Sequence, residues 1–167
     1  MIRLLENEGT RDIKLYDVVN YAGHDWYVIY IDDEDVHLLA KDKVFGRHIF
    51  DEKSNDYKAS DIRKYLNSEI LSKLKSRGAN PLPIYMSDIG ATDRVWLLSV
   101  KEAERIPENI RKFGDYWWLR SPSSRYYDCA VCVILDGSVY DDGGYVNDGG
   151  LIVVRPAIRV KIEELQK

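Results

Sequence analysis

The stretch Tyr116–Ile158 reads YWWLRSPSSRYYDCAVCVILDGSVYDDGGYVNDGGLIVVRPAI, and the rest of the chain is best interpreted around it. It begins with three large aromatic residues and ends with an apolar run that leads into Arg155 and Pro156. Between these ends, residues 126–150 contain no Lys, Glu, Gln, Met or Trp. They are mainly Tyr, Asp, Gly, Val, Cys, Ser and Asn, and Tyr, Ser, Gly and Asn are the residues that antibody paratopes favour. This composition indicates a ligand-binding surface.

The length and charge of the chain limit what it can be. A chain of 167 residues is typical of one domain with a proper core, so we expect a single domain over residues 1–167. The formal net charge of −4 provides no basic surface for nucleic acid, and we expect no such partner. Two cysteines do not make a disulfide framework.

No apolar run reaches the length of a transmembrane helix, so we expect no membrane insertion. The N-terminal segment MIRLLENEGT has no apolar core of the kind that a signal peptide needs. We therefore expect the protein to be cytoplasmic as synthesised, unless a virion or a larger assembly carries it.

The N-terminal half predicts strands followed by a helix. Residues 16–31 alternate and are rich in Val, Tyr and Ile, which predicts a hairpin that turns at Gly23-His24-Asp25. Residues 36–40 predict a short buried strand, and a polar loop over 41–58 follows. Ser60 is a suitable N-cap for an amphipathic helix over residues 60–75. We interpret the charged face of that helix, which includes Arg63, as solvated.

The C-terminal half predicts a helix and several further strands. Residues 94–99 predict a strand that leads into a helix at 100–105, and Ser99 and Glu102 have the spacing of a capping box. Pro107 begins a short turn. Asp136-Gly137 predicts a hairpin between strands at 129–135 and 138–141. Gly-rich turns and one long strand at 151–160 then close an α+β fold with a loop-rich C-terminal third.

Several motifs resemble a known family. WWLRSP at 117–122 and VRPAI at 154–158 resemble the variable target proteins of diversity-generating retroelements. More narrowly, they resemble a bacterial and phage domain family with the signature WWLRSP…VRPA. Upstream, Trp26-Tyr27-Val28, SDIRKYLN at 60–67 and RVWLLSVKEAE at 94–104 fit that family too, so the resemblance covers nearly the whole chain.

The resemblance implies a C-type-lectin fold whose closing sheet displays hypervariable side chains on one solvent-facing surface, within residues 116–158. In such systems a reverse transcriptase copies a template with errors at adenines, so that AAC-like codons vary at their first two positions. These codons can yield Tyr, Asp, Asn, Ser, Cys, Gly, Ile, Leu and Val. They cannot yield Lys, Glu, Gln, Met or Trp, the five residue types absent from 126–150.

Within this region, scaffold and display positions can be separated by pattern. We interpret Ala130, Val131, Val133, Val139 and Val146 as scaffold, together with the turn residues Asp136, Gly137 and Gly143. The remaining positions are the candidates for the ligand-binding surface: Tyr126, Tyr127, Asp128, Cys129, Cys132, Ile134, Leu135, Ser138, Tyr140, Asp141, Asp142, Gly144, Tyr145, Asn147 and Asp148.

The aromatic block and the two arginines of the end motifs are better explained by structure than by binding. We expect Trp117 and Trp118 to belong to the core, with alternate rings facing in and out. Arg120 and Arg155 are expected to pair with carbonyls or buried carboxylates behind the variable surface. These four residues form the predicted scaffold.

Chemistry at the cysteines or histidines has little support. Cys129 and Cys132 have C-x-x-C spacing, but in a strand an odd offset predicts opposite faces, which disfavours a redox pair or a shared metal. The formylglycine-generating enzymes share the implied fold class and use two cysteines, but the surrounding residues do not match their pattern. The three histidines lack zinc-site spacing, and no nucleophile elbow or phosphate-binding loop is present. We expect no enzyme, no cofactor and no metal.

The sequence therefore predicts a non-enzymatic binding protein whose ligand is an unknown protein or glycan. Two alternatives stay open. One is an undiversified structural or accessory module of a phage particle or bacterial surface. The other is a calcium-dependent carbohydrate-binding module, although turn chemistry also explains Asp and Asn beside Gly. Its candidate oxygen ligands are Asp128, Asp141, Asp142, Asn147 and Asp148. The sequence does not indicate an oligomeric state.

Overall fold

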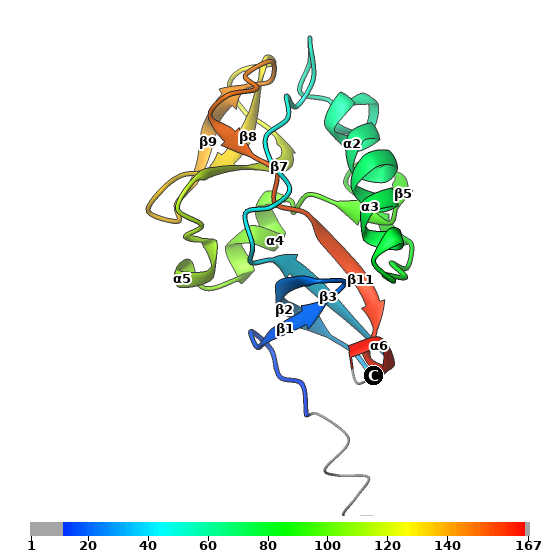
Figure 1. Ribbon diagram of the computed structural model, residues 1–167. Helices are drawn as coiled ribbons and strands as arrows, with labels where there is room; N and C mark the ends of the chain where they lie inside the picture. The colour runs from blue at the N-terminus through cyan, green and yellow to red at the C-terminus, as the bar shows by residue number, and fades with distance from the viewer. Residues whose placement is uncertain (1–11, 166–167) are drawn as a thin grey trace, which may run out of the picture.

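The computed structural model describes residues 12–165, and the predicted α+β class is confirmed over that part of the chain. The segment MIRLLENEGT, on which the absence of a signal peptide was judged, lies outside the described residues. In Figure 1, a four-stranded sheet lies at the upper left, a five-stranded sheet lies below it, and a long helix runs along the right side. Within residues 12–165, no helix is both long and apolar enough to cross a membrane.

The five-stranded sheet is antiparallel and has the order β1-β2-β3-β11-β6. Its strands are β1 (Val18–Tyr21), β2 (His24–Ile31), β3 (Asp35–Ala40), β11 (Ala157–Lys161) and β6 (Val95–Trp96). The predicted hairpin and the strand after it are confirmed. The turn is one residue earlier than predicted, at Ala22 and Gly23, whose φ angles of 53° and 76° suit a tight hairpin.

The predicted helix over 60–75 is confirmed, with one wide turn inside it. It consists of α2 (Asp61–Tyr65), the π-type turn η2 (Leu66–Ile70) and α3 (Leu71–Ser76), and the short helix η1 (Tyr57–Ala59) precedes it. The Ser60 hydroxyl accepts a hydrogen bond from the Arg63 amide, as an N-cap should. The buried positions Ile62, Leu66, Ile70 and Leu74 repeat every four residues. Because an α-helix has 3.6 residues per turn, a wider turn helps to keep them on one face.

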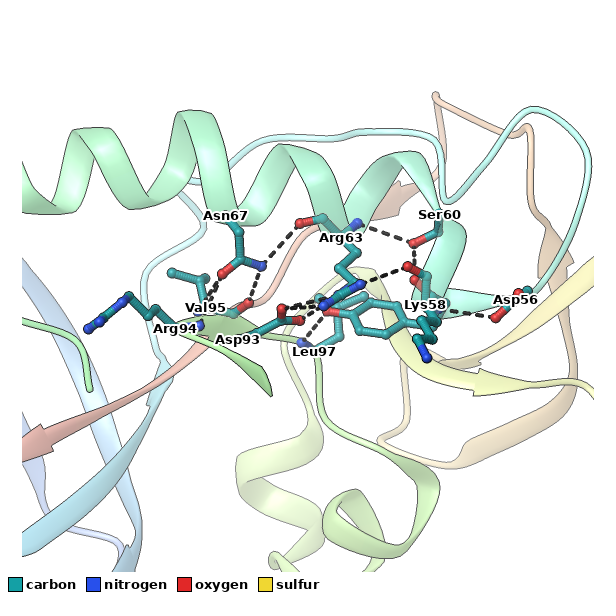
Figure 2. A network of polar contacts seen from close by, with 10 residues as sticks. Asp56, Lys58, Ser60, Arg63, Asn67, Asp93, Arg94, Val95 and Leu97 are labelled. Carbon is teal, nitrogen blue, oxygen red and sulfur yellow. Dashed lines mark hydrogen bonds and ion pairs between the residues drawn. The ribbon is translucent and has the colours of Figure 1, made fainter. Parts of the chain in front are cut away.

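Polar contacts fix this helix to the strands beside it (Figure 2). The Arg63 side chain donates to both carboxylate oxygens of Asp93, whose side chain is only 5% exposed, at 2.9 to 3.1 Å. The Asn67 amide donates to the carbonyls of Arg63 and Val95, and its oxygen accepts from the amides of Arg94 and Val95. The interpretation of Arg63 as part of a solvated face is therefore wrong. Asp93 ends β5 (Ala91–Asp93), which pairs with β4 (Ile84–Met86).

Three further helices are short: α4 (Val100–Arg105), α5 (Glu108–Arg111) and α6 (Ile162–Leu165). The predicted capping box of α4 is confirmed. The Ser99 hydroxyl accepts from the Glu102 amide at 3.2 Å, and the Glu102 carboxylate accepts from the Ser99 amide at 2.8 Å. The turn predicted after Pro107 is the helix α5, which leads into the aromatic block.

The four-stranded sheet has the order β10-β7-β8-β9, with β10 parallel to β7 and the other pairs antiparallel. Its strands are β7 (Tyr116–Pro122), β8 (Cys129–Val133), β9 (Val139–Tyr145) and β10 (Ile152–Val153). The hairpin at Asp136-Gly137 is confirmed, and Gly137 has a φ of 88°. The interpretation of Gly143 as a turn residue is wrong, because Gly143 and Gly144 both lie inside β9.

The predicted long strand over 151–160 is also wrong, because the chain changes sheets in the middle of it. β10 belongs to the four-stranded sheet and β11 to the five-stranded sheet. Val154, Arg155 and Pro156 lie between them and are buried. Pro156 has no amide proton for a continuous ladder, and the Arg155 side chain binds carbonyls of other segments.

Both tryptophans of the aromatic block are fully buried, so the expectation that their rings alternate between inside and outside is wrong. The Trp117 indole donates to the carbonyl of Arg111, and the Trp118 indole donates to that of His48. Phe50 packs on Trp118 with ring centroids 5.5 Å apart. Phe50 belongs to the segment predicted as a polar loop, which in fact covers one face of β7.

The two scaffold arginines are buried among acceptors. The Arg155 guanidinium donates to the carbonyls of Ala40 and Ile110 at 2.7 and 2.8 Å and lies 4.2 Å from the centroid of the Phe113 ring. Burial lowers the pKa of Arg155 to about 9, so the group stays charged at neutral pH. Arg120 donates to both carboxylate oxygens of Asp88 at 2.9 Å, and also to Glu102.

Candidate functional site

A pocket of about 470 Å³ opens on the four-stranded sheet, where β8, β9 and the start of β10 meet. Many of the predicted display residues converge on it. Those that line it are Tyr126, Asp128, Cys129, Cys132, Tyr140, Asp142, Gly144, Tyr145 and Asp148. The structure therefore brings together, in one hollow, residues that were selected from composition and from the resemblance to a family with variable positions.

Tyrosine rings form the walls of the pocket. Tyr126, Tyr140 and Tyr145 are 44%, 44% and 64% exposed, and Tyr116 joins them from the start of β7 with 38%. β9 is the edge strand of its sheet, so no further strand of that sheet flanks the pocket on this side. Rigid amphipathic rings in such a position supply contact area at little cost in conformational entropy.

The floor of the pocket needs glycine. A Cβ atom on Gly143, which has a φ of 67°, would lie 1.9 Å from the carbonyl oxygen of Ala130. A Cβ atom on Gly144 would lie 2.3 Å from Cδ1 of Ile152 and 3.4 Å from the Trp118 ring. Gly144 was predicted as a display position, but the space there admits a side chain only if Ile152 moves.

Carboxylates supply the charge of the site. Asp142 lies 3.5 Å from the Arg125 guanidinium, and the Asp148 side chain accepts from the amides of Gly150 and Leu151. Asp128 accepts a weak hydrogen bond from the Cys129 thiol at 3.6 Å. Among the described residues that line the pocket there are three aspartates and no Lys, Arg or His, so the formal charge of the lining is negative.

Both cysteines line this pocket, so the prediction that they lie on opposite faces is wrong. The pairing of β8 with β9 shifts register between Ala130 and Cys132, and simple alternation does not hold across such an irregularity. Burial is the main cause that raises the pKa of both thiols, to about 12 for Cys132, and Asp128 raises that of Cys129 further. At neutral pH both are protonated and behave as small apolar groups rather than nucleophiles.

The other predicted display residues lie outside the hollow. Tyr127, Leu135, Ser138, Asp141 and Asn147 are exposed, and Ile134 packs against the core. Asp141 accepts hydrogen bonds from Ser124. Leu135 lines a neighbouring hollow of about 280 Å³, which shares Tyr116 and Leu151 with the pocket.

Sequence reasoning missed four residues that line the pocket: Tyr116, Gly143, Leu151 and Ile152. Ile152 lies opposite Tyr116 in the parallel pairing of β10 with β7, and no local pattern reveals that pairing. Asn55 was also missed. Its amide donates to the carbonyls of Tyr126 and Cys129 and so holds the entry to β8.

The part of the chain that the structure describes has no cluster of side chains that could hold a metal ion. Within residues 12–165, no group of three or more His, Cys, Asp or Glu side chains is placed to hold a metal ion. The three histidines are in separate surroundings: His24 near Phe45, His37 near Trp96, and His48 stacked on Tyr65.

Comparison with known proteins gives one finding. The family model described as "Domain of unknown function (DUF6273)" matches residues 34–162, which include every residue that lines the pocket. No curated protein and no solved structure matches the chain.

Proposed function

This chain belongs to the DUF6273 family, and we propose that it is a non-enzymatic protein that binds a protein or glycan ligand through the tyrosine and aspartate pocket. One observation carries the proposal. The segment with paratope-like composition lines an open hollow on an edge strand, while tryptophans and arginines of the flanking motifs are buried beneath and beside it. Such a division suits a surface that changes its ligand while its support stays constant.

We further assign the domain a C-type-lectin-like fold. Three features support this assignment: the last strand, β11, pairs with the early strand β3; the helices α2 to α5 precede the second sheet; and the second sheet carries the pocket. An experimental structure, compared by superposition with lectin-like domains, tests it.

Diversification by a retroelement is the most specific part of the proposal. It is supported by the absence of Lys, Glu, Gln, Met and Trp between residues 126 and 150, and by the end motifs at 117–122 and 154–158. The test is to sequence the DNA around the gene. We expect a reverse transcriptase gene and a near-copy of codons 120–157 that differs only at adenines. If neither is present, diversification is refuted, and the ligand-binding proposal is tested separately.

Ligand binding is tested by screening protein and glycan arrays with matched variants. Tyr145→Ser removes a ring that is 64% exposed in the pocket, and Tyr85→Ser removes a ring that is 65% exposed on β4. We expect the first variant to lose the array signals of the unmodified protein and the second to keep them. Equal signals from both variants would refute a role for the pocket.

A further inference from the structure

The side chains that line the pocket indicate the charge of the ligand that it would bind. Four tyrosines and three aspartates line it, and among its described lining residues none is positively charged. Carboxylates in the wall of a hollow are stabilised when a cation enters and pairs with them. Tyrosine rings attract the same cation through their negative π-faces.

The protein already places one guanidinium at the edge of this pocket. Arg125, in the loop between β7 and β8, lies 5.4 Å from the centroid of the Tyr126 ring and 3.5 Å from the Asp142 carboxylate. Its side chain is 64% exposed, so it is not committed to the core. Arg125 thus makes, from outside, the two kinds of contact that the pocket offers to a cation.

The floor of the pocket is compatible with a long cationic side chain. Cys129 and Cys132 are neutral at physiological pH, and Ile152 is apolar, so the methylene groups of the ligand meet an apolar surface. The volume of about 470 Å³ falls in the range of pockets that accept small molecules or single side chains of a partner.

We propose that the pocket receives an arginine side chain presented by a partner protein, with the guanidinium stacked on the tyrosine rings and paired with Asp142 and Asp128. Arginine fits better than lysine because its planar group stacks on rings and binds carboxylates with two hydrogen bonds. This inference rests on the proposed function, since it names the ligand class of the same pocket.

The test uses N-acetyl-arginine amide as the probe and N-acetyl-citrulline amide as its neutral isostere. Amide resonances of ¹⁵N-labelled protein are followed by NMR at constant ionic strength. We expect saturable shifts, at millimolar probe concentration, for amides around Gly144 and Tyr145, and much weaker shifts with citrulline. Equal shifts with both probes, or none at these amides, would overturn the inference.

Variants separate charge from shape. Asp142→Asn should weaken probe binding by up to about five-fold, the range of a partly exposed ion pair. Asp33→Asn makes the same change of charge at an exposed site outside the pocket and should leave binding unaltered. Arg125→Ala should strengthen binding by a similar factor, because it removes the internal competitor for Asp142 and Tyr126. Weaker or unchanged binding by Arg125→Ala would contradict the proposed competition.

A second pair isolates the aromatic contribution. Tyr140→Phe keeps the ring and should retain probe binding, whereas Tyr140→Ser should weaken it about two- to five-fold. Failure of the arginine inference and failure of the proposed function give different experimental results. If the citrulline probe binds as well as arginine, the pocket still binds ligands but does not select a cation. If neither binds, the inference fails, and the array experiment with Tyr145→Ser and Tyr85→Ser decides the wider proposal independently.

Discussion

Two groups of aromatic residues lie close together in this protein and have opposite environments. The scaffold group is Trp117 and Trp118 on β7, which are fully buried, and their indole N–H groups donate to backbone carbonyls. The pocket group includes Tyr140 and Tyr145 on β9, which are 44% and 64% exposed. The two groups lie close together, because a Cβ atom on Gly144, the neighbour of Tyr145 in β9, would lie 3.4 Å from the Trp118 ring.

This contrast indicates that neighbouring strands serve different purposes: the buried tryptophans of β7 serve stability, and the exposed tyrosines of β9 serve recognition. The free energy of unfolding depends on side chains that lose contact with water, and the scaffold group meets that condition. Exposed tyrosines contribute little to folding and are available to a ligand. A surface can then change its specificity without loss of the fold, provided that the layer under it stays constant.

The largest expected effect is at Trp118. Trp118→Ala should reduce the free energy of unfolding by about 3–5 kcal/mol, because it opens a cavity between Phe50 and the pocket floor and leaves the His48 carbonyl without its donor. Urea unfolding followed by circular dichroism measures this. A loss below about 1 kcal/mol, the range of surface substitutions, would break the proposed division.

The glycines of the floor should give the next largest effect. Gly143→Ala places a Cβ atom against the backbone of Ala130 at a φ of 67° and should cost about 2 kcal/mol or more. The Cβ atom of Gly144→Ala would overlap with the end of the Ile152 side chain, which can rotate, and would make an ordinary contact with the Trp118 ring, so this variant should cost less. The same urea titration ranks the two variants, and the reverse order would contradict the described floor.

A smaller effect should appear in acid at Asp88, the partner of Arg120. Burial by itself raises the pKa of Asp88, but the hydrogen bonds and positive charge of Arg120 outweigh it, and the net pKa is lowered. A carboxyl with a lowered folded pKa stabilises the protein above its unfolded pKa, and that stability is lost as the pH falls through the folded value.

Unmodified protein should therefore lose stability more steeply than Asp88→Asn as the pH falls below about 4. The Asp88 side chain is 44% exposed, so screening limits the difference to about 1 kcal/mol. Urea midpoints measured from pH 7 downwards test this. Parallel curves for the two proteins would show that the ion pair does not contribute.

The smallest effect on stability is expected at the pocket tyrosines. Tyr126→Ser, Tyr140→Ser and Tyr145→Ser should each change the free energy of unfolding by less than about 1 kcal/mol, because these residues are 44%, 44% and 64% exposed. Thermal unfolding of the three variants beside Trp118→Ala gives the comparison directly. A tyrosine variant as unstable as Trp118→Ala would assign that ring to the scaffold.

Local signals in the sequence were sufficient for much of the fold. The capping box of Ser99 and Glu102, the N-cap at Ser60 and the hairpin at Asp136-Gly137 were all predicted, because each depends on residues within a few positions of one another. Residue composition, together with the resemblance to a family with variable positions, also led to many of the residues that line the pocket, without any knowledge of the pairing of strands.

Long-range pairing explains what was missed. Arg63 and Asp93 are 30 residues apart, and no sequence pattern near Arg63 predicts this ion pair. Tyr116 and Ile152 meet only because β10 pairs with β7 in parallel. Cys129 and Cys132 share a pocket because the register of β8 shifts, which a strict alternation of faces does not anticipate.

The parallel pairing of β7 with β10 has a consequence for the length of the chain between them. Ile152 lies opposite Tyr116 and Val153 opposite Trp117, so the polypeptide leaves the scaffold and returns to it at neighbouring points. Closing a longer loop between fixed ends costs only about 0.6 kcal/mol for each doubling of its length. Insertions at residues 123–128 or 146–150 would therefore change the size of the hollow at small entropic cost.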